Sequence, residues 1–287
     1  MCARERAIMD KHGDAVYKAI KEHLARLKEL QRSDGGWYYY NFVRDSSSFS
    51  TASTVIILEA LKNMNVEVSL CNEMIPPACG LISKMRIGKG TYKYMEMPGY
   101  NSSMSPLGAS ARSPLCEFAL FCAEKGDPDD YKQAVMNWFN NVHLLKKVKG
   151  LAGTHIGKGM TAPYYFLYSH MYMARAVKVM PKNQARGMLR IITGMMLSYQ
   201  EPDFTWSDWT MTKDYKIAQT SLALVTLWHL ATGDRDPSVA PLRSGGVINP
   251  AGTVTGDKKK DEDPKPEDGK EPPKEEPKDE PGKEPPK

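Results

Sequence analysis

A seven-residue pattern, Q-x-x-D-x-x-W, occurs twice in the chain and constrains its fold more than any other feature. It spans residues 31–37 and 200–206, which lie 169 residues apart. A degenerate copy follows the first after 55 residues, at 86–92, and an eroded copy begins at Lys147. A repeat unit of about 56 residues accounts for all four positions.

Two further landmarks keep this period. Small residues lead from each loop into a helix at 51–52, 110–111, 161–162 and 217–218. Gly-Asp pairs recur two units apart, at 13–14, 126–127 and 233–234. Because glycine often ends a helix and aspartate caps the next one, we expect a helix boundary at each pair.

Apolar residues recur with helical periodicity over eight segments. These segments are 14–31, 49–64, 69–86, 110–125, 129–147, 162–180, 182–199 and 216–232. The aromatic run 37–40 is a candidate strand. We therefore expect an all-α protein in which each unit pairs an outer helix with an inner helix, joined by a loop that carries the pattern.

The complete box Q-x-x-D-G-x-W at 31–37, followed by Ser-Thr-Ala at 50–52, resembles the QW repeat of squalene-hopene cyclases and, more broadly, the α/α-toroids of protein prenyltransferases. The stretch 153–170 is similar to bacterial prenyltransferase/squalene-oxidase-repeat proteins. The resemblance covers residues 14–232 and implies an α/α-toroid, here a partial ring of about four helical hairpins. The box residues, for which we expect a structural role, are Gln31, Asp34, Gly35, Trp37, Gln200, Asp203 and Trp206.

The repeat register also predicts how the chain is divided. Residues 2–12 fall where an inner helix would end, so we expect either an open partial toroid or a native start upstream of Met1. Residues 1–235 should form the repeat domain, and Asp-Pro at 236–237 should begin a linker that runs to 256. The tail 257–287 contains only Asp, Glu, Lys, Pro and Gly, and we expect it to be disordered because it has no apolar side chain to bury.

Composition excludes several classes of protein. The net charge of +5 is scattered without a basic stripe, so no nucleic-acid partner is expected. No apolar stretch approaches the roughly 20 residues of a transmembrane helix. Without a signal sequence the chain is expected in the cytoplasm, or exported to the periplasm if its start is missing.

Catalytic motifs of related toroids are absent or have a simpler explanation. The run 127–130, Asp-Pro-Asp-Asp, matches the acid motif D-x-D-D of class II terpene cyclases, but an acidic first turn behind an Asp cap explains it better. Cys116, His155 and His170 lack the spacing of a zinc site. We therefore expect no metal or cofactor, and the catalytic residues, if any exist, are unknown.

The loops and the N-termini of the inner helices should meet at one surface, which we call the rim. Free N–H groups there favour anionic or polar ligands. The residues expected at the rim or in the cavity behind it are Tyr92, His155, Lys158, Tyr164, Tyr168, His170, Asp208, Trp209 and Tyr215. Their aromatic rings could stack on a sugar or lipid, or could simply be part of the core.

Two functions remain open at this stage. The first is a non-catalytic toroid that binds a small molecule, a glycan or lipid, or another protein through its rim. The alternative is an enzyme that acts on a polyprenyl or terpenoid substrate.

Deletion of residues 240–287 should leave the melting temperature almost unchanged, because a tail without apolar side chains contributes nothing to a core. Thermal unfolding followed by circular dichroism checks this. A drop of many degrees would show that the tail packs on the repeat domain.

Overall fold

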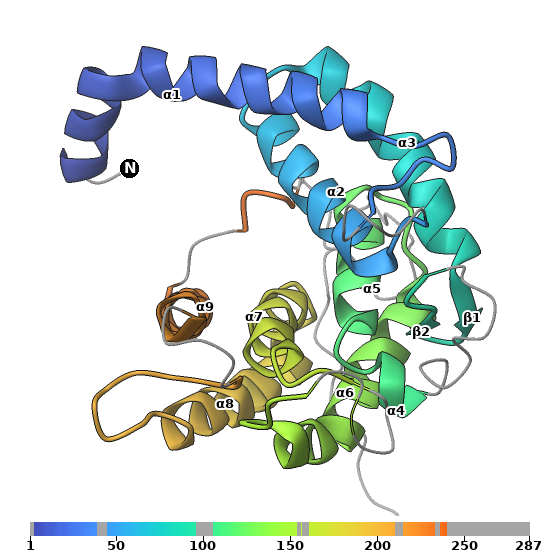
Figure 1. Ribbon diagram of the computed structural model, residues 1–287, viewed down its shortest axis with the longest axis vertical. Helices are drawn as coiled ribbons and strands as arrows, with labels where there is room; N and C mark the ends of the chain where they lie inside the picture. Colours follow the sequence, from blue (N-terminus) through green and yellow to red (C-terminus); the bar gives the residue numbers. More distant parts are fainter. Residues whose placement is uncertain are drawn as a thin grey trace, which may run out of the picture. The chain divides into compact units, whose positions relative to one another are not determined.

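The computed structural model describes residues 3–38, 45–95, 106–153, 156, 161–209, 215–232 and 236–239, with side chains from residue 11 onward. Within these ranges the regular structure is helical apart from one hairpin, in which β1 (Arg86–Gly88) pairs with β2 (Thr91–Tyr92) (Figure 1). The prediction of an all-α fold is confirmed. The expected tail 257–287, the Gly-Asp pair 233–234 and the expected rim residues His155 and Lys158 lie outside the described residues.

Every segment predicted to be helical contains a helix. The helices are α1 (Ala3–Leu30), α2 (Ser48–Asn63), α3 (Val68–Lys84), α4 (Pro106–Ala109), α5 (Ser113–Cys122), α6 (Pro128–Val148), α7 (Tyr165–Lys178), α8 (Lys182–Ser198) and α9 (Tyr215–Ala231). α5 starts later than predicted because Pro114 cannot donate the backbone hydrogen bond that would extend the helix to residue 110. The described part of the candidate strand 37–40 contributes only an isolated bridge between Tyr38 and Ser46.

α1 departs most from the prediction. It begins at Ala3 and continues through the Gly-Asp pair at 13–14, where a boundary was expected. Glycine inside a helix costs about 1 kcal/mol relative to alanine, and the helix-forming residues on both sides offset that amount. A Gly-Asp pair alone is therefore an insufficient signal for a helix end.

The helices form two sets that alternate along the chain. α2 packs on α5, α5 on α7 and α7 on α9, and we call these four the inner helices. Of the outer helices, α3 packs on α2 and α5, α6 on α5 and α7, and α8 on α7 and α9 (Figure 1). The core therefore continues from one helical pair to the next through residues such as Val55, Leu120, Met173 and Ala223.

The first box joins three helices through hydrogen bonds. The side-chain amide of Gln31 donates to the carbonyl oxygens of Gly35, at 2.8 Å, and of Met74 in α3, at 2.9 Å. The indole N–H of Trp37 donates to the carbonyl of Leu27 in α1, at 2.9 Å, and its backbone N–H donates to the hydroxyl of Thr51 in α2, at 3.2 Å. The loop is thus fixed to α1, α2 and α3 together.

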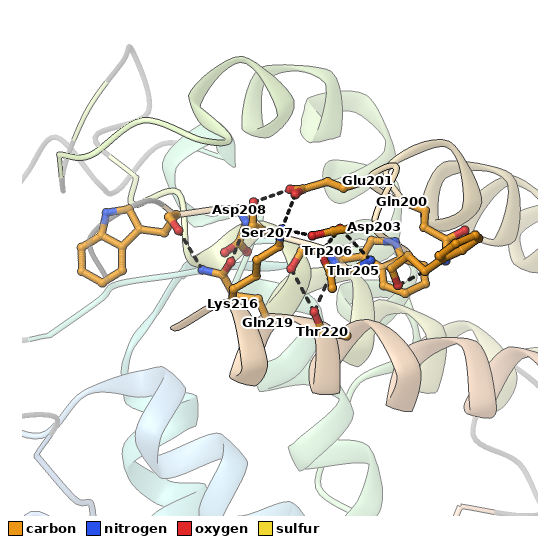
Figure 2. A network of polar contacts seen from close by, with 12 residues as sticks. Gln200, Glu201, Asp203, Thr205, Trp206, Ser207, Asp208, Lys216, Gln219 and Thr220 are labelled. Atoms are coloured by element: carbon orange, nitrogen blue, oxygen red, sulfur yellow. Dashed lines mark hydrogen bonds and ion pairs between the residues drawn. The ribbon is translucent and has the colours of Figure 1, made fainter. Parts of the chain in front are cut away.

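The second box makes the counterparts of three of these four bonds 169 residues later, all except the bond from Gln31 to Met74 (Figure 2). Gln200 Nε2 donates to the carbonyl of Phe204 at 3.4 Å, the indole of Trp206 to the carbonyl of Met196 at 2.8 Å, and the Trp206 backbone N–H to Thr220 Oγ1 at 3.2 Å. Each pair of atoms has the same sequence separation as its counterpart in the first box. The two loops therefore share one hydrogen-bonding pattern.

The fifth position of the box has a left-handed backbone in three copies but holds different residues, Gly35, Gly90 and Phe204. Gly35 has φ +93°, and a Cβ there would lie 2.3 Å from the carbonyl oxygen of Pro77 in α3, so only glycine fits. Gly90 of the degenerate copy has φ +56° and approaches Ala134 of α6 equally closely. Phe204 keeps the left-handed backbone, with φ +63°, but its side chain is 77% exposed.

Residues 236–239, which we expected to begin the linker, are packed on the inner helices, and we call them the strap. The Asp236 carboxylate accepts hydrogen bonds from Arg175 of α7 at 2.6 and 2.8 Å. Ser238 Oγ lies 3.3 Å from Cys122 Sγ of α5, and Asn63 Nδ2 donates to the carbonyl of Pro237 at 3.1 Å. The described part of the expected linker therefore belongs to the folded unit.

Loss of the Asp236 carboxylate should destabilise the protein. Burial alone would raise the pKa of Asp236, but the bonds from Arg175 lower it to about 2. Asp236→Ala leaves the Arg175 guanidinium buried without this partner, so we expect the free energy of unfolding near neutral pH to fall by about 3–5 kcal/mol in chemical denaturation. The wild-type contribution should be full above the ordinary pKa of 3.8 and be lost as the pH falls toward 2.

The control is Glu29→Ala, which removes an ion pair with Arg26 that is exposed to solvent at both ends. It should cost less than about 1 kcal/mol. Equal losses for the two variants would contradict a stabilising role for the strap.

Candidate functional site

Asp208, two residues after the second box, connects three parts of the fold. Its carboxylate Oδ2 accepts the backbone N–H of Leu167 in the first turn of α7, at 2.8 Å. Its own backbone N–H donates to the side chain of Gln219 in α9 at 2.9 Å, and its carbonyl accepts from Gly150 at 2.7 Å. Because the Leu167 bond fixes Asp208 at the start of α7, the side chain acts as a cap supplied from a distant loop. Figure 2 shows Asp208 beside Gln219.

The environment of Asp208 favours its protonated form. The side chain is fully buried, which raises the pKa of its carboxyl to about 7, although the Leu167 N–H and the charge of Lys149 act in the opposite direction. Oδ1 has no hydrogen-bond partner among the described residues. A carboxyl with a pKa near neutrality can donate or accept a proton at physiological pH.

Three aromatic side chains contact one another around Trp209, the residue after Asp208, and we call them the rim aromatics: Tyr164, Trp209 and Tyr215. The ring centroid of Trp209 is 5.0 Å from that of Tyr164 and 5.1 Å from that of Tyr215. The Trp209 indole donates to the carbonyl of Ala152 at 2.9 Å, which fixes the ring. Tyr164 immediately precedes α7, Tyr215 begins α9, and Trp209 lies in the loop after the second box. All three residues are half-buried.

The rim aromatics continue into a second group along α7. Tyr165 contacts Tyr164, at 4.8 Å between centroids, and Tyr168, at 6.1 Å. Tyr168 in turn contacts Tyr172 at 4.9 Å, and its hydroxyl is 3.1 Å from Ser53 Oγ of α2. The structure thus brings together four of the predicted residues, Tyr164, Tyr168, Trp209 and Tyr215, along one aromatic path, and Asp208 immediately precedes Trp209 in the chain.

His170 does not belong to this path. Its Nδ1 is 2.7 Å from the carbonyl oxygen of Phe166, and its ring packs against Trp138 at 4.9 Å. Full burial lowers the pKa of His170 to about 4, so the ring is neutral at physiological pH. His170 is therefore a core residue, and its expected place at the rim or in the cavity is wrong.

Tyr92 is also separate from the rim aromatics and belongs to a buried polar cluster. Its hydroxyl donates to Glu117 at 2.5 Å, and Arg86 pairs with Glu117 at 3.2 Å and with Asp130 at 2.8 Å. Burial raises the pKa of Glu117 to about 7, while Tyr92 and Arg86 lower it in part. Sequence reasoning did not identify Glu117, although an acid inside the otherwise apolar helix α5 was an available signal.

The D-x-D-D run is a helix cap in the structure. The Asp127 side chain accepts the backbone N–H groups of Asp129, at 2.8 Å, and of Asp130, at 3.0 Å, and Pro128 begins α6. Within the described ranges, no group of three or more His, Cys, Asp or Glu side chains is arranged to hold a metal ion. None of the described helices combines the length and the apolar character needed to span a bilayer.

Comparison with known proteins gives no independent assignment. No protein-family model matches the sequence, and no curated protein matches it significantly. The function therefore has to be inferred from the geometry of the side chains.

Asp208 should make stability depend on pH. The folded chain retains the proton up to about pH 7, whereas the ordinary pKa of the group is 3.8, so the stability associated with Asp208 is full below 3.8 and lost as the pH rises through about 7. Asp208→Asn keeps an oxygen for the Leu167 N–H and removes the titration. We expect the melting temperature of this variant, relative to wild type, to increase between about pH 4 and about pH 8.

The matched control is Asp203→Asn in the same loop. Hydrogen bonds to Lys216 and Thr205 lower the pKa of Asp203 to about 2, so this variant should not become relatively more stable as the pH rises. A melting-temperature difference for Asp208→Asn that stays constant with pH would show that Asp208 is ionised throughout.

Proposed function

We propose that the chain is a QW-repeat protein of the α/α-toroid type that binds a ligand at the rim aromatics and does not catalyse a reaction. The shared hydrogen bonds of the two boxes support this architecture, because loops with the same bonds to preceding and following helices are expected of repeated units. The alternation of inner and outer helices agrees with it.

The single observation that carries the binding proposal is the contact of Tyr164, Trp209 and Tyr215 at the starts of two inner helices. Aromatic side chains in a core are normally covered, whereas these three keep part of their rings accessible. Partly exposed tyrosine and tryptophan rings combine an apolar face with a polar edge. Such a surface suits a ligand of the same character.

We infer that the ligand is a glycan. The apolar C–H face of a sugar ring can stack on Trp209, and its hydroxyl groups can reach hydrogen-bonding groups of the neighbouring loops. Polyprenyl lipids share the apolar character but carry no hydroxyl groups that could match the polar edges of these rings. The Tyr168 and Ser53 hydroxyls extend the same polar and aromatic character along α7 and α2.

One observation favours the alternative, an enzyme that acts on a polyprenyl or terpenoid substrate. Asp208 is a buried carboxyl with a pKa of about 7, and such groups serve as general acids in many active sites. Its bond to the α7 backbone also explains the same side chain as a cap. The cap requires no reaction, so we prefer the binding function.

Trp209→Ala should weaken ligand binding. A panel of soluble oligosaccharides and polyprenyl phosphates is tested by thermal shift and by tryptophan fluorescence. We expect an oligosaccharide to raise the melting temperature of the wild type, and Trp209→Ala to weaken its binding by more than about tenfold, because a stacking ring is lost.

Trp228→Ala is the control, since Trp228 is an exposed tryptophan on another face of α9. It should bind as the wild type does. Equal losses for both variants, or no stabilisation by any sugar, would contradict a glycan site at the rim. Conversion of squalene or a prenyl diphosphate to product, abolished by Asp208→Asn, would establish the enzyme instead.

A further inference from the structure

The first and last inner helices have opposite patterns of exposure. Residues of α9 and α2 correspond at an offset of 169, as the two boxes do, because Thr220 and Thr51 accept the equivalent tryptophan N–H. From Ile217 to Trp228, the exposed residues of α9 are Ile217, Ala218, Ser221, Leu224, Val225 and Trp228. Their counterparts in α2, all buried, are Ser48, Phe49, Ala52, Val55, Ile56 and Glu59. We call this exposed set on α9 the C-end face. Ala231, the last residue of the helix, is also exposed, but its counterpart Lys62 is not buried.

The inversion also holds in the other direction. The buried residues of α9 are Gln219, Ala223, Thr226 and His229. Their counterparts in α2, none of which is buried, are Ser50, Thr54, Ile57 and Ala60. Met64 continues the same stripe, seven residues after Ile57. We call Ser50, Thr54, Ile57, Ala60 and Met64 the N-end face.

Packing inside the chain explains the inversion. The α2 counterpart of the C-end face is covered by the helices that follow, α3 and α5, and Cys116 of α5 reaches the carbonyl of Ser48. The α9 counterpart of the N-end face is covered by the helix that precedes it, α7. The two open faces are therefore the two halves of the interface that already joins successive units.

The surface at the N-terminal end of α9, beside the C-end face, contains a hollow. The hollow has a volume of about 320 Å³ and is lined by Thr205, Lys216, Ile217, Thr220 and Ser221. In the first unit the equivalent position is filled, because Leu81 of the outer helix α3 lies against Gly36 and Thr51 is beside it. Thr205 stands where the first unit has Gly36, and its Cβ takes part of the space that Leu81 occupies there, so the hollow marks uncovered space at the C-end face and is not a copy of the Leu81 contact.

We propose that the C-end face binds the N-end of a second copy of this chain, in a head-to-tail assembly. The second copy begins with an outer helix and an inner helix, α1 and α2, which is the pair that would follow α8 and α9. α1 carries the exposed apolar residues Val16 and Tyr17, and α2 carries Ile57, which is 56% exposed. On the C-end face Ile217 and Trp228 are 72% and 51% exposed, so apolar surface meets apolar surface.

The contact is heterologous, since different faces of the two copies meet. When two copies join in this way, the C-end face of one copy and the N-end face of the other remain open. Further copies can therefore add until the assembly closes into a ring, or it can continue to grow. Tryptophan in an interface commonly contributes more to binding than its neighbours, and Trp228 is the tryptophan of the C-end face.

The test uses the full-length chain in sedimentation velocity over a wide range of concentrations. The wild type should increase in mass with concentration. Leu224→Asp on the C-end face and Ile57→Asp on the N-end face should each raise the dissociation constant by more than about tenfold, because both place a charge in an apolar contact. Leu197→Asp, at an exposed position of the outer helix α8, is the matched control and should assemble as the wild type does.

Mixing the variants distinguishes a head-to-tail contact from a symmetric one. Leu224→Asp retains the N-end face and Ile57→Asp retains the C-end face, so an equimolar mixture should form a complex of two chains and no larger. Association of Ile57→Asp with itself would indicate that two C-end faces pair, and would overturn the proposal. Circular dichroism verifies that each variant folds, and Trp228→Ser serves as a second C-end variant.

A wild type that stays monomeric at every concentration would also overturn the proposal. In that case, assembly after deletion of residues 240–287 would identify the chain's own C-terminal segment as the occupant of the C-end face. A truncated chain that remains monomeric would show that neither occupant binds there.

Discussion

The indole N–H of each box tryptophan donates to a backbone carbonyl ten residues earlier, in the last turns of an outer helix. This bond satisfies a carbonyl near the helix end and holds the loop against that helix. The same tryptophan then uses its backbone N–H to reach a threonine hydroxyl in the next inner helix. The direction in which the inner helix leaves the loop therefore depends on two bonds from one residue.

The position of the candidate site follows from this constraint. Trp206 is buried and held by both bonds, so Asp208 and Trp209, which follow it directly, have little freedom. Asp208 can then accept the Leu167 N–H at the start of α7. Trp209 can contact Tyr164, which lies one helical turn before Leu167. The site is thus built on a loop whose geometry is fixed by a structural motif and not by the ligand.

Local patterns in the sequence predicted the helices and the Asp127 cap because these depend on residues close together in the chain. The box spacing likewise indicated which loops would share a hydrogen-bonding pattern. Features that depend on distant partners were missed. The burial of Asp236 needs Arg175, the raised pKa of Glu117 needs the surrounding core, and the cap provided by Asp208 needs α7. The path of α1 through Gly13 was missed for another reason, since a weak local signal was outweighed by its neighbours.

The strap has a consequence for how the protein unfolds. In a stack of helical pairs whose contacts are only between neighbours, the terminal pair can open while the rest stays folded. Here three short contacts connect the segment after α9 to α7, to α5 and to the end of α2. Opening of the last pair would pull on contacts with helices from three units at once. Unfolding of the described inner helices should therefore be more cooperative than contacts between neighbouring pairs alone would make it. In particular, we expect α9 to be protected from local unfolding.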